Sequence, residues 1–141
     1  GEVVAELAAL VAPDLDAKRL KLAASSAAGQ TIEADREMFR QALFNLVQNA
    51  VQFSPEGSAI DVSFGSDREG TVRIEVADRG PGVPPEAVEL LYTPYHTTRP
   101  DGAGLGLAIV RRIASAHGWR TGYSPRPGGG AIFWIADIPA R

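Results

Sequence analysis

Apolar residues along the chain follow two different periods, which predicts a mixture of amphipathic helices and half-buried strands. A period of three to four residues runs through 2–11, through the segment from Asp35 to Phe53, and through 105–118. Because this period gathers apolar side chains on one face of a helix, we expect a helix in each segment. Segments typical of strands lie at 20–25, 31–34, 60–65, 72–77, 119–124 and 131–138.

Breaker residues set the expected ends of these elements. Pro13 should end the first helix, because proline lacks the N–H that a helix interior needs. Asp35 is the expected N-cap of the long helix, and residues 54–57 (Ser-Pro-Glu-Gly) should stop it. A short helix is expected at 85–92, and Gly118 should close the last helix. The order of elements predicts an α/β sandwich with a mixed, mostly antiparallel sheet that helices cover on one face.

Composition limits the classes of function that are open to the chain. Its 141 residues suit one domain spanning 1–141, and its net charge of −3 gives no electrostatic reason to expect nucleic acid or direct membrane contact. It has no cysteine, which excludes thiolate metal sites and fits a cytoplasmic setting. The chain begins inside an apolar helical pattern, so we expect it to be part of a longer protein.

The long helix has an unusual polar face. This face carries amides rather than charges, namely Gln41, Asn45, Gln48, Asn49 and Gln52. Asn45 and Asn49 are four residues apart and therefore neighbours on the helix surface. An amide oxygen is a neutral ligand that can complete the coordination shell of Mg²⁺ while phosphate oxygens supply the charge. The alternative is that these amides bond to nearby backbone.

A second polar feature, Asp78-Arg79-Gly80-Pro81-Gly82, directly follows an expected strand. The two glycines allow backbone to approach a flat ligand closely or to adopt positive φ. The Asp78 carboxylate accepts hydrogen bonds only, which suits an exocyclic amine such as that of adenine. An Asx-turn at a strand end is the alternative interpretation.

A third feature is a glycine-rich stretch, 102–107 (Gly-Ala-Gly-Leu-Gly-Leu), that leads into the last helix. Glycine-rich backbone before a helix presents free N–H groups and the positive end of the dipole, which together suit a phosphate. Thr97, Thr98 and Arg99 lie just upstream and could add hydroxyls and a cation. A flexible loop is the alternative.

Taken in order, these segments resemble the nucleotide-binding boxes of bacterial sensor histidine kinases. Residues 45–55 resemble the asparagine box and 78–84 the first glycine box. Residues 92–99 resemble the phenylalanine box and lid, and 102–110 the second glycine box. All four occur in family order, and the resemblance covers nearly the whole chain. It implies a Bergerat-type α/β sandwich that binds ATP with Mg²⁺.

The resemblance also implies roles for individual residues. Asn49 would coordinate Mg²⁺, Asn45 would support the metal and the phosphates, and Asp78 would bind the adenine amino group. The other residues expected at the nucleotide are Phe53, Gly80, Gly82, Thr97, Thr98, Arg99, Gly102, Gly104, Leu105, Gly106 and Leu107. Of these, Arg99 is expected to take part in catalysis together with Asn45 and Asn49.

The implied reaction transfers the γ-phosphate of ATP to a histidine. His96 and His117 lack the family's acceptor setting, so the acceptor is expected on a separate dimerisation and histidine-phosphotransfer domain of the same parent protein. That phosphate would pass to a response regulator receiver domain. The fragment is expected to be a monomer, and a membrane-anchored parent stays open. The short lid resembles the nitrogen-regulation type of sensor kinase.

Three positions depart from the family pattern. Gln52 replaces a frequent Lys or Arg, Gln48 replaces the Glu that related ATPases use to activate water, and Ala131 stands near a usual Thr. Two alternatives therefore stay open: an anti-sigma factor-type serine kinase, and a degenerate nucleotide-binding module that docks partners without turnover. A gyrase-type ATPase is disfavoured, because glutamine is no general base.

Overall fold

The computed structural model describes residues 2–26, 35–66, 70–90 and 106–140. Its helices are α1 (Glu2–Ala17), α2 (Arg36–Phe53) and α3 (Gly106–His117), with a short 3₁₀ helix η1 (Pro85–Leu90). Its strands are β1 (Lys21–Ser26), β2 (Ala59–Ser66), β3 (Thr71–Ala77), β4 (Arg120–Pro125) and β5 (Ala131–Pro139). The strand expected at 31–34 lies outside the described residues.

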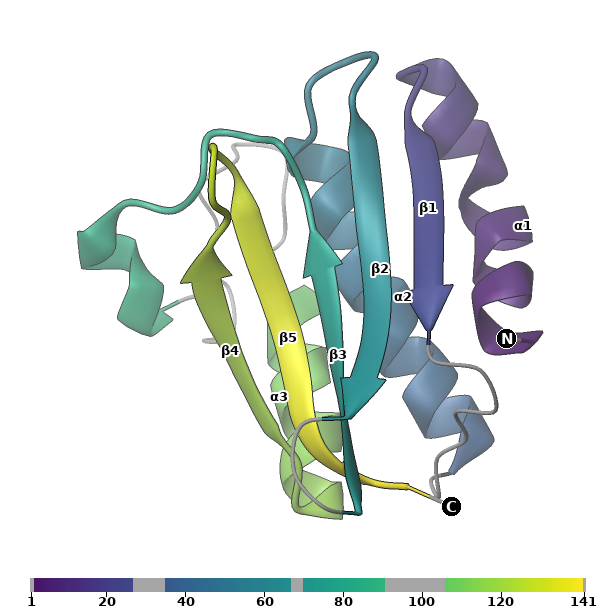
Figure 1. The fold of residues 1–141 in the computed structure, drawn as a ribbon, viewed down its shortest axis with the longest axis vertical. Helices are drawn as coiled ribbons and strands as arrows, with labels where there is room; N and C mark the ends of the chain where they lie inside the picture. The colour runs from purple at the N-terminus through teal and green to yellow at the C-terminus, as the bar shows by residue number, and fades with distance from the viewer. Residues whose placement is uncertain (1, 27–34, 67–69, 91–105, 141) are drawn as a thin grey trace.

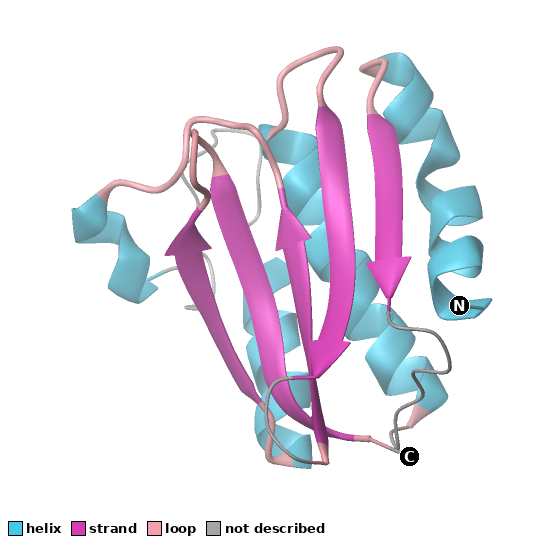
Figure 2. Cartoon of the chain, in the orientation of Figure 1, coloured by secondary structure: helices cyan, strands magenta, loops and turns pink. Residues whose placement is uncertain are grey.

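The strands form one mixed sheet in the order β1-β2-β3-β5-β4. Strand β1 is parallel to β2, and the other neighbouring strands are antiparallel. Figure 1 shows α2 and α3 behind one face of this sheet, with α1 beside β1. Figure 2 shows the same two layers by type of secondary structure. The predicted α/β sandwich is therefore confirmed.

The core lies between the sheet and the helices because both layers keep their predicted periods. In β3, Val72, Ile74 and Val76 are buried at every second position, and the residues between them are partly exposed. In α2, the buried residues recur at helical spacing and include Leu43 and Leu46. The alternation matters for the site, because it decides which residues after β3 face the helices and which face away.

Helix α1 does not end at Pro13, so the predicted end was wrong. It continues to Ala17 with Pro13 inside it. Leu7, Val11 and Leu15 lie four residues apart and are buried in the core. Burial of Leu15 requires the turn after Pro13, so tertiary packing outweighs the hydrogen bond that the proline ring removes.

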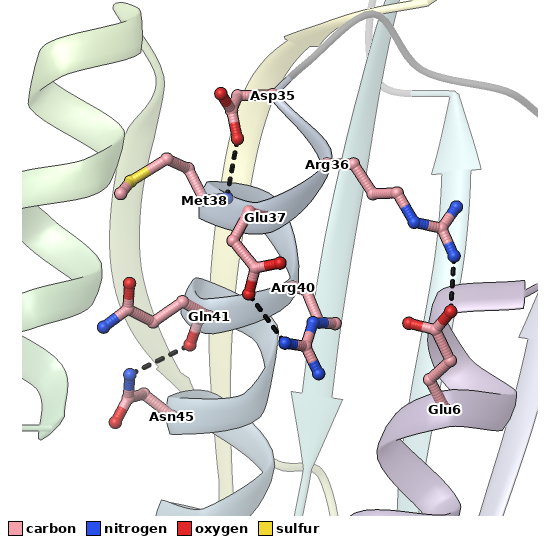
Figure 3. A network of polar contacts seen from close by, with 8 residues as sticks. All are labelled: Glu6, Asp35, Arg36, Glu37, Met38, Arg40, Gln41 and Asn45. Carbon is pink, nitrogen blue, oxygen red and sulfur yellow. Dashed lines mark hydrogen bonds and ion pairs between the residues drawn. The ribbon is translucent and has the colours of Figure 1, made fainter.

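Helix α2 begins and ends as predicted. Asp35 is the N-cap, and its side chain accepts a hydrogen bond of 2.9 Å from the N–H of Met38 (Figure 3). Ser54 is the C-cap, and both its N–H and its Oγ donate to the carbonyl of Ala50. Arg36 in the first turn pairs with Glu6 of α1, so the two helices are also joined at the surface.

The remaining predicted elements lie close to their expected bounds. Strands β2 and β3 pair antiparallel as the expected hairpin. The helix expected at 85–92 is a 3₁₀ helix as far as Leu90, beyond which the chain is not described. Gly118 ends α3 with φ +77°, the conformation that favours glycine after a helix. Among the described helices, none is long and apolar enough to cross a membrane.

Candidate functional site

Part of the amide face of α2, at Gln41 and Asn45, lies toward α3 (Figure 3). The Nδ2 of Asn45 donates a 2.9 Å hydrogen bond to the carbonyl of Gln41, one turn earlier. Figure 3 shows this pair on the side of α2 near α3. Asn45 Oδ1, which takes no part in that bond, faces the start of α3: a Cβ at Gly106 would lie 3.6 Å from it. A glycine there leaves room beside the amide.

Two polar atoms near this face are buried without a partner. They are Nδ2 of Asn49 and Oδ2 of Asp78, and neither has a hydrogen bond among the described residues. Leaving such a group unpaired costs about 1–3 kcal/mol, so unpaired buried groups are uncommon in folded proteins. A half-turn of the Asn49 side-chain amide exchanges its nitrogen and oxygen, so this group could present either a donor or an acceptor to a ligand.

The carboxylate of Asp78 is nearly inaccessible, with 1% of the residue exposed. Its Oδ1 accepts a 2.8 Å hydrogen bond from the N–H of Gly80, and its own N–H donates to the carbonyl of Ala131 at 2.9 Å. Burial raises the pKa of this carboxyl above its ordinary value. The backbone at Gly80 and Ala131 and the charge of Arg126 lower that pKa and offset part of the rise.

Glycines let three backbone segments meet around Asp78. A Cβ at Gly80 would lie 2.4 Å from the carbonyl oxygen of Phe53 at the end of α2. A Cβ at Gly130, in the turn between β4 and β5, would lie 2.0 Å from the carbonyl oxygen of Asp78. Both distances are shorter than a real Cβ contact, so only glycine fits these positions in this backbone arrangement.

The far end of the loop that follows β3, at Gly82 and Val83, contacts strand β4. Gly82 has φ +75°, and a Cβ there would lie 3.8 Å from the Tyr123 hydroxyl oxygen. The next N–H, of Val83, donates to that hydroxyl at 3.3 Å. The Tyr123 ring packs on Phe133 with ring centroids 5.5 Å apart. The core therefore fixes the hydroxyl that holds the loop.

The described structure thus brings together part of the expected site. Of the expected residues, Asn45 of α2 lies beside Gly106 of α3, and Phe53 at the end of α2 lies beside Gly80 of the loop after β3. Leu107 is half-buried against the core. The other expected residues, Thr97, Thr98, Arg99, Gly102, Gly104 and Leu105, lie outside the described residues, as does His96.

The three departures from the family pattern differ in exposure. Gln52 is exposed, Gln48 is half-buried, and Ala131 is 3% exposed. Ala131 holds Asp78 through its backbone carbonyl, but its methyl group offers no polar atom to a ligand.

His117 Nδ1 lies 2.7 Å from the carbonyl of Ile113, and its ring stacks on Trp119. These contacts fasten the end of α3 to the start of β4.

The structure adds residues for which sequence reasoning predicted no role in the site. Gly130 and Arg126 lie between two expected strands, at 119–124 and 131–138, yet Gly130 packs on Asp78 and the charge of Arg126 lowers the pKa of Asp78. Arg79 was part of a motif, but nothing in the pattern showed what its side chain binds. Strand alternation was the one available signal, because it places Arg79 on the opposite side of the sheet from Asp78.

Among the described residues, no group of three or more His, Cys, Asp or Glu side chains could hold a metal.

This fold and its grouped polar side chains define an α/β sandwich domain with a candidate ligand site between the helices and one end of the sheet. A family model described as "Histidine kinase-, DNA gyrase B-, and HSP90-like ATPase" matches residues 34–141. The chain belongs to this family. The expected Bergerat-type domain is confirmed at that level.

The individual relatives that the chain resembles are sensor proteins and histidine kinases. The chain is 37% identical over 139 residues to the C4-dicarboxylate transport sensor protein DctS of Rhodobacter capsulatus, covering 95% of this chain and 21% of DctS. Its structure is similar to the catalytic domain of histidine kinase ThkA, with a TM-score of 0.87 and 31% identity over 98% of this chain and 90% of that one.

Two further structures show such domains with ligands or partners. Full-length ShkA, solved in complex with AMPPNP, has a TM-score of 0.87 and 34% identity, over 99% of this chain and 30% of ShkA. ThkA has also been solved in complex with the response regulator protein TrrA, with a TM-score of 0.83 and 28% identity, over 98% of this chain and 40% of that one. The chain thus spans about a fifth of DctS and less than a third of ShkA.

Proposed function

We propose that this chain is the catalytic ATP-binding domain of a sensor histidine kinase and that its candidate site binds ATP with Mg²⁺. The observation that carries the proposal is that two buried polar atoms, Nδ2 of Asn49 and Oδ2 of Asp78, have no hydrogen-bond partner in the part of the chain that the structure describes. Both belong to residues that the family resemblance assigns to the nucleotide. The AMPPNP complex of ShkA, a relative that carries an adenine nucleotide, supports the same ligand class.

In this proposal Asp78 binds the adenine end of the nucleotide. Its free Oδ2 accepts a hydrogen bond from the exocyclic amine, while Gly80 holds Oδ1 and so fixes the direction of the carboxylate. Gly80 and Gly82 keep the loop thin enough for the base to approach. The backbone carbonyl of Phe53, at the end of α2, lies beside this loop. In this proposal the Phe53 ring contributes apolar surface next to the base.

The amides of α2 serve the other end of the nucleotide. Asn49 provides an oxygen ligand to Mg²⁺, and Asn45 supports the metal and the phosphates through the oxygen that faces Gly106. Neutral amides fit this task because they add no negative charge beside the phosphates. The metal, when bound, would neutralise charge on the phosphates. Thr97, Thr98, Arg99, Gly102, Gly104 and Leu105 complete the phosphate end.

In the whole protein, the γ-phosphate is transferred to a histidine on a dimerisation domain of the same parent and then to a response regulator. The complex of ThkA with TrrA supports a partner of this kind. The chain itself contributes positioning and charge stabilisation through Asn45, Asn49 and Arg99. We place the domain in the cytoplasm, a placement that a membrane-anchored parent allows, and assign the lid to the short nitrogen-regulation type.

A phosphotransfer assay tests this proposal. The chain is mixed with ATP, Mg²⁺ and the separately produced dimerisation domain of its parent protein, and acid-labile, base-stable phosphohistidine is measured. We expect labelling of the dimerisation domain that Asn49→Ala abolishes. Nucleotide binding without any labelling would favour the degenerate docking module, and base-labile phosphoserine on a protein partner would favour the anti-sigma factor-type kinase.

A further inference from the structure

The residue next to Asp78 points to the other side of the sheet. Val72, Ile74 and Val76 of β3 face the helices, and Asp78 continues this set one step beyond the strand. Arg73, Glu75 and Ala77 alternate with them and lie on the face without helices, and the next position in that series is Arg79. Figure 1 shows that α2 and α3 cover only one face.

On the open face, Arg79 is tied to β2 at two points. Its Nη1 donates to the carbonyl oxygen of Ala59 at 2.5 Å, and its Nη2 lies 2.9 Å from Oδ2 of Asp61. Asp61 in turn pairs in register with Ala77, the last residue of β3. The guanidinium therefore bridges β2 and the first residues of the loop that follows β3.

The backbone around Arg79 has little freedom to absorb a displacement. A Cβ at Gly130 would lie 3.0 Å from the Cα of Arg79, so the turn between β4 and β5 packs directly on this residue. Gly80 packs equally closely on the carbonyl of Phe53. Because the packing is tight, a shift of Arg79 would also move the neighbouring Asp78 carboxylate and the Gly80 N–H that orients it.

We propose that Arg79 is a positioning residue that sets the affinity and base selectivity of the nucleotide site from the opposite face of the sheet, by anchoring the Asp78–Gly80 turn to Ala59 and Asp61. This inference rests on the proposed function, since it concerns the same site. Arg79 does not touch the nucleotide in this account. It acts by holding the direction of the Asp78 carboxylate.

The same open face offers a matched control. Arg73 and Glu75 of β3 form an ion pair of 3.0 Å, with side-chain exposures of 27% and 37%. The Arg79–Asp61 pair has similar geometry, 2.9 Å, and similar exposures of 35% and 45%. Exposed pairs of this kind contribute about 0–1 kcal/mol to stability, so losing either pair should change the unfolding temperature little. Glu75→Gln is the closer control, because Arg73→Ala also removes a guanidinium that lies 4.2 Å from the Trp134 ring centroid. Only the Arg79–Asp61 pair is connected to the turn that holds Asp78 in the candidate nucleotide site.

The experiment measures dissociation constants of Mg·ATP and Mg·GTP, together with unfolding temperatures, for the unmodified chain and five variants. The test variants are Arg79→Ala, Arg79→Lys and Asp61→Asn, and the control variants are Arg73→Ala and Glu75→Gln. We expect Arg79→Ala to weaken ATP binding about three- to tenfold, the effect of weakening one hydrogen bond between a displaced Asp78 carboxylate and the adenine amine, and to reduce the preference for ATP over GTP. Asp61→Asn should have a smaller effect in the same direction.

Arg79→Lys should recover part of the ATP affinity, because an ammonium group can still reach one of the two acceptors. The control variants should leave both dissociation constants unchanged. Unchanged selectivity in Arg79→Ala, or an equal loss in Arg73→Ala, would overturn the inference while the proposed function stands. Absence of ATP binding by the unmodified chain would instead overturn the proposed function and, with it, this inference.

Discussion

Asp78 and Gly80 form a one-sided contact: Oδ1 of the carboxylate accepts the Gly80 N–H at 2.8 Å, while Oδ2 is buried and has no partner among the described residues. The held oxygen fixes the plane of the carboxylate, and the free oxygen remains as an acceptor. Such an arrangement costs free energy in the unliganded chain, and a ligand donor recovers it. This relationship underlies the predictions for the adenine end.

Asp78→Asn should weaken ATP binding about ten- to hundredfold, since it replaces a charge-assisted hydrogen bond with a neutral one or an unpaired donor. GTP binding should change much less, because guanine carries a carbonyl where adenine carries the amine. Calorimetric titrations of both nucleotides measure the ratio. Equal losses for ATP and GTP would rule out the adenine role of Asp78.

The same variant should make the unliganded chain more stable at neutral pH. Burial raises the pKa of Asp78 in the folded chain above its value in the unfolded chain. Its contribution to stability is therefore fully present below the unfolded pKa, about 3.9, and is lost as pH rises through the folded pKa. Asn does not titrate, so the stability of Asp78→Asn relative to the unmodified chain should increase over that range and then level off.

Urea unfolding of both proteins from pH 4 to pH 7.5, without nucleotide, measures this difference. Arg126 supplies an independent check, because its positive charge lowers the pKa of Asp78. In Arg126→Gln the levelling-off should move to higher pH. A difference that stays flat over the whole range would show that Asp78 is not destabilised by burial.

Alanine substitutions at Gly130 and Gly129 form a matched pair that tests how tightly the backbone packs around Asp78. Their φ angles are nearly equal, +114° and +112°, so alanine is strained at both. A Cβ at Gly130 would lie 2.0 Å from the Asp78 carbonyl oxygen, whereas among the described residues no heavy atom lies within 4 Å of one at Gly129. Gly130→Ala should therefore cost about 1–3 kcal/mol more in free energy of unfolding than Gly129→Ala. Chemical denaturation measures both, and equal costs would mean that the backbone at 130 shifts freely.

The sequence predicted the elements of this fold well where periodicity and caps act locally. The Asp35 cap, the end of α2 at Ser54, and the β2–β3 hairpin depend on neighbouring residues, and all three are confirmed. The predicted end of the first helix at Pro13 was wrong, because α1 is extended by the burial of Leu15 in the core. This burial is a tertiary effect and cannot be predicted from neighbouring residues alone.

The candidate site was predictable only as a set of motifs. The contacts that shape it join segments far apart in sequence: Gly80 with Phe53, Gly130 with Asp78, and Arg79 with Asp61. Residue types can suggest that a glycine or an arginine has a task, but the partner depends on strand order and register. Chain order alone does not reveal that β5 lies next to β3 in the sheet.

Asn49→Ala should separate the metal end of the site from the adenine end. It removes a buried polar atom that has no partner among the described residues, so the stability of the unliganded chain should fall by less than about 1 kcal/mol. The increase in ATP affinity caused by Mg²⁺ should disappear, while the metal-free affinity stays close to that of the unmodified chain. An undiminished effect of Mg²⁺ would place the metal elsewhere.

The most direct test of the account is calorimetric titration of the unmodified 141-residue chain with ATP, with and without Mg²⁺, beside Asp78→Asn. We predict binding that Mg²⁺ strengthens and that the variant largely loses, since the two ends of the nucleotide use Asn49 and Asp78. Absence of ATP binding by the unmodified chain, or full ATP affinity in Asp78→Asn, would contradict the assignment of this site.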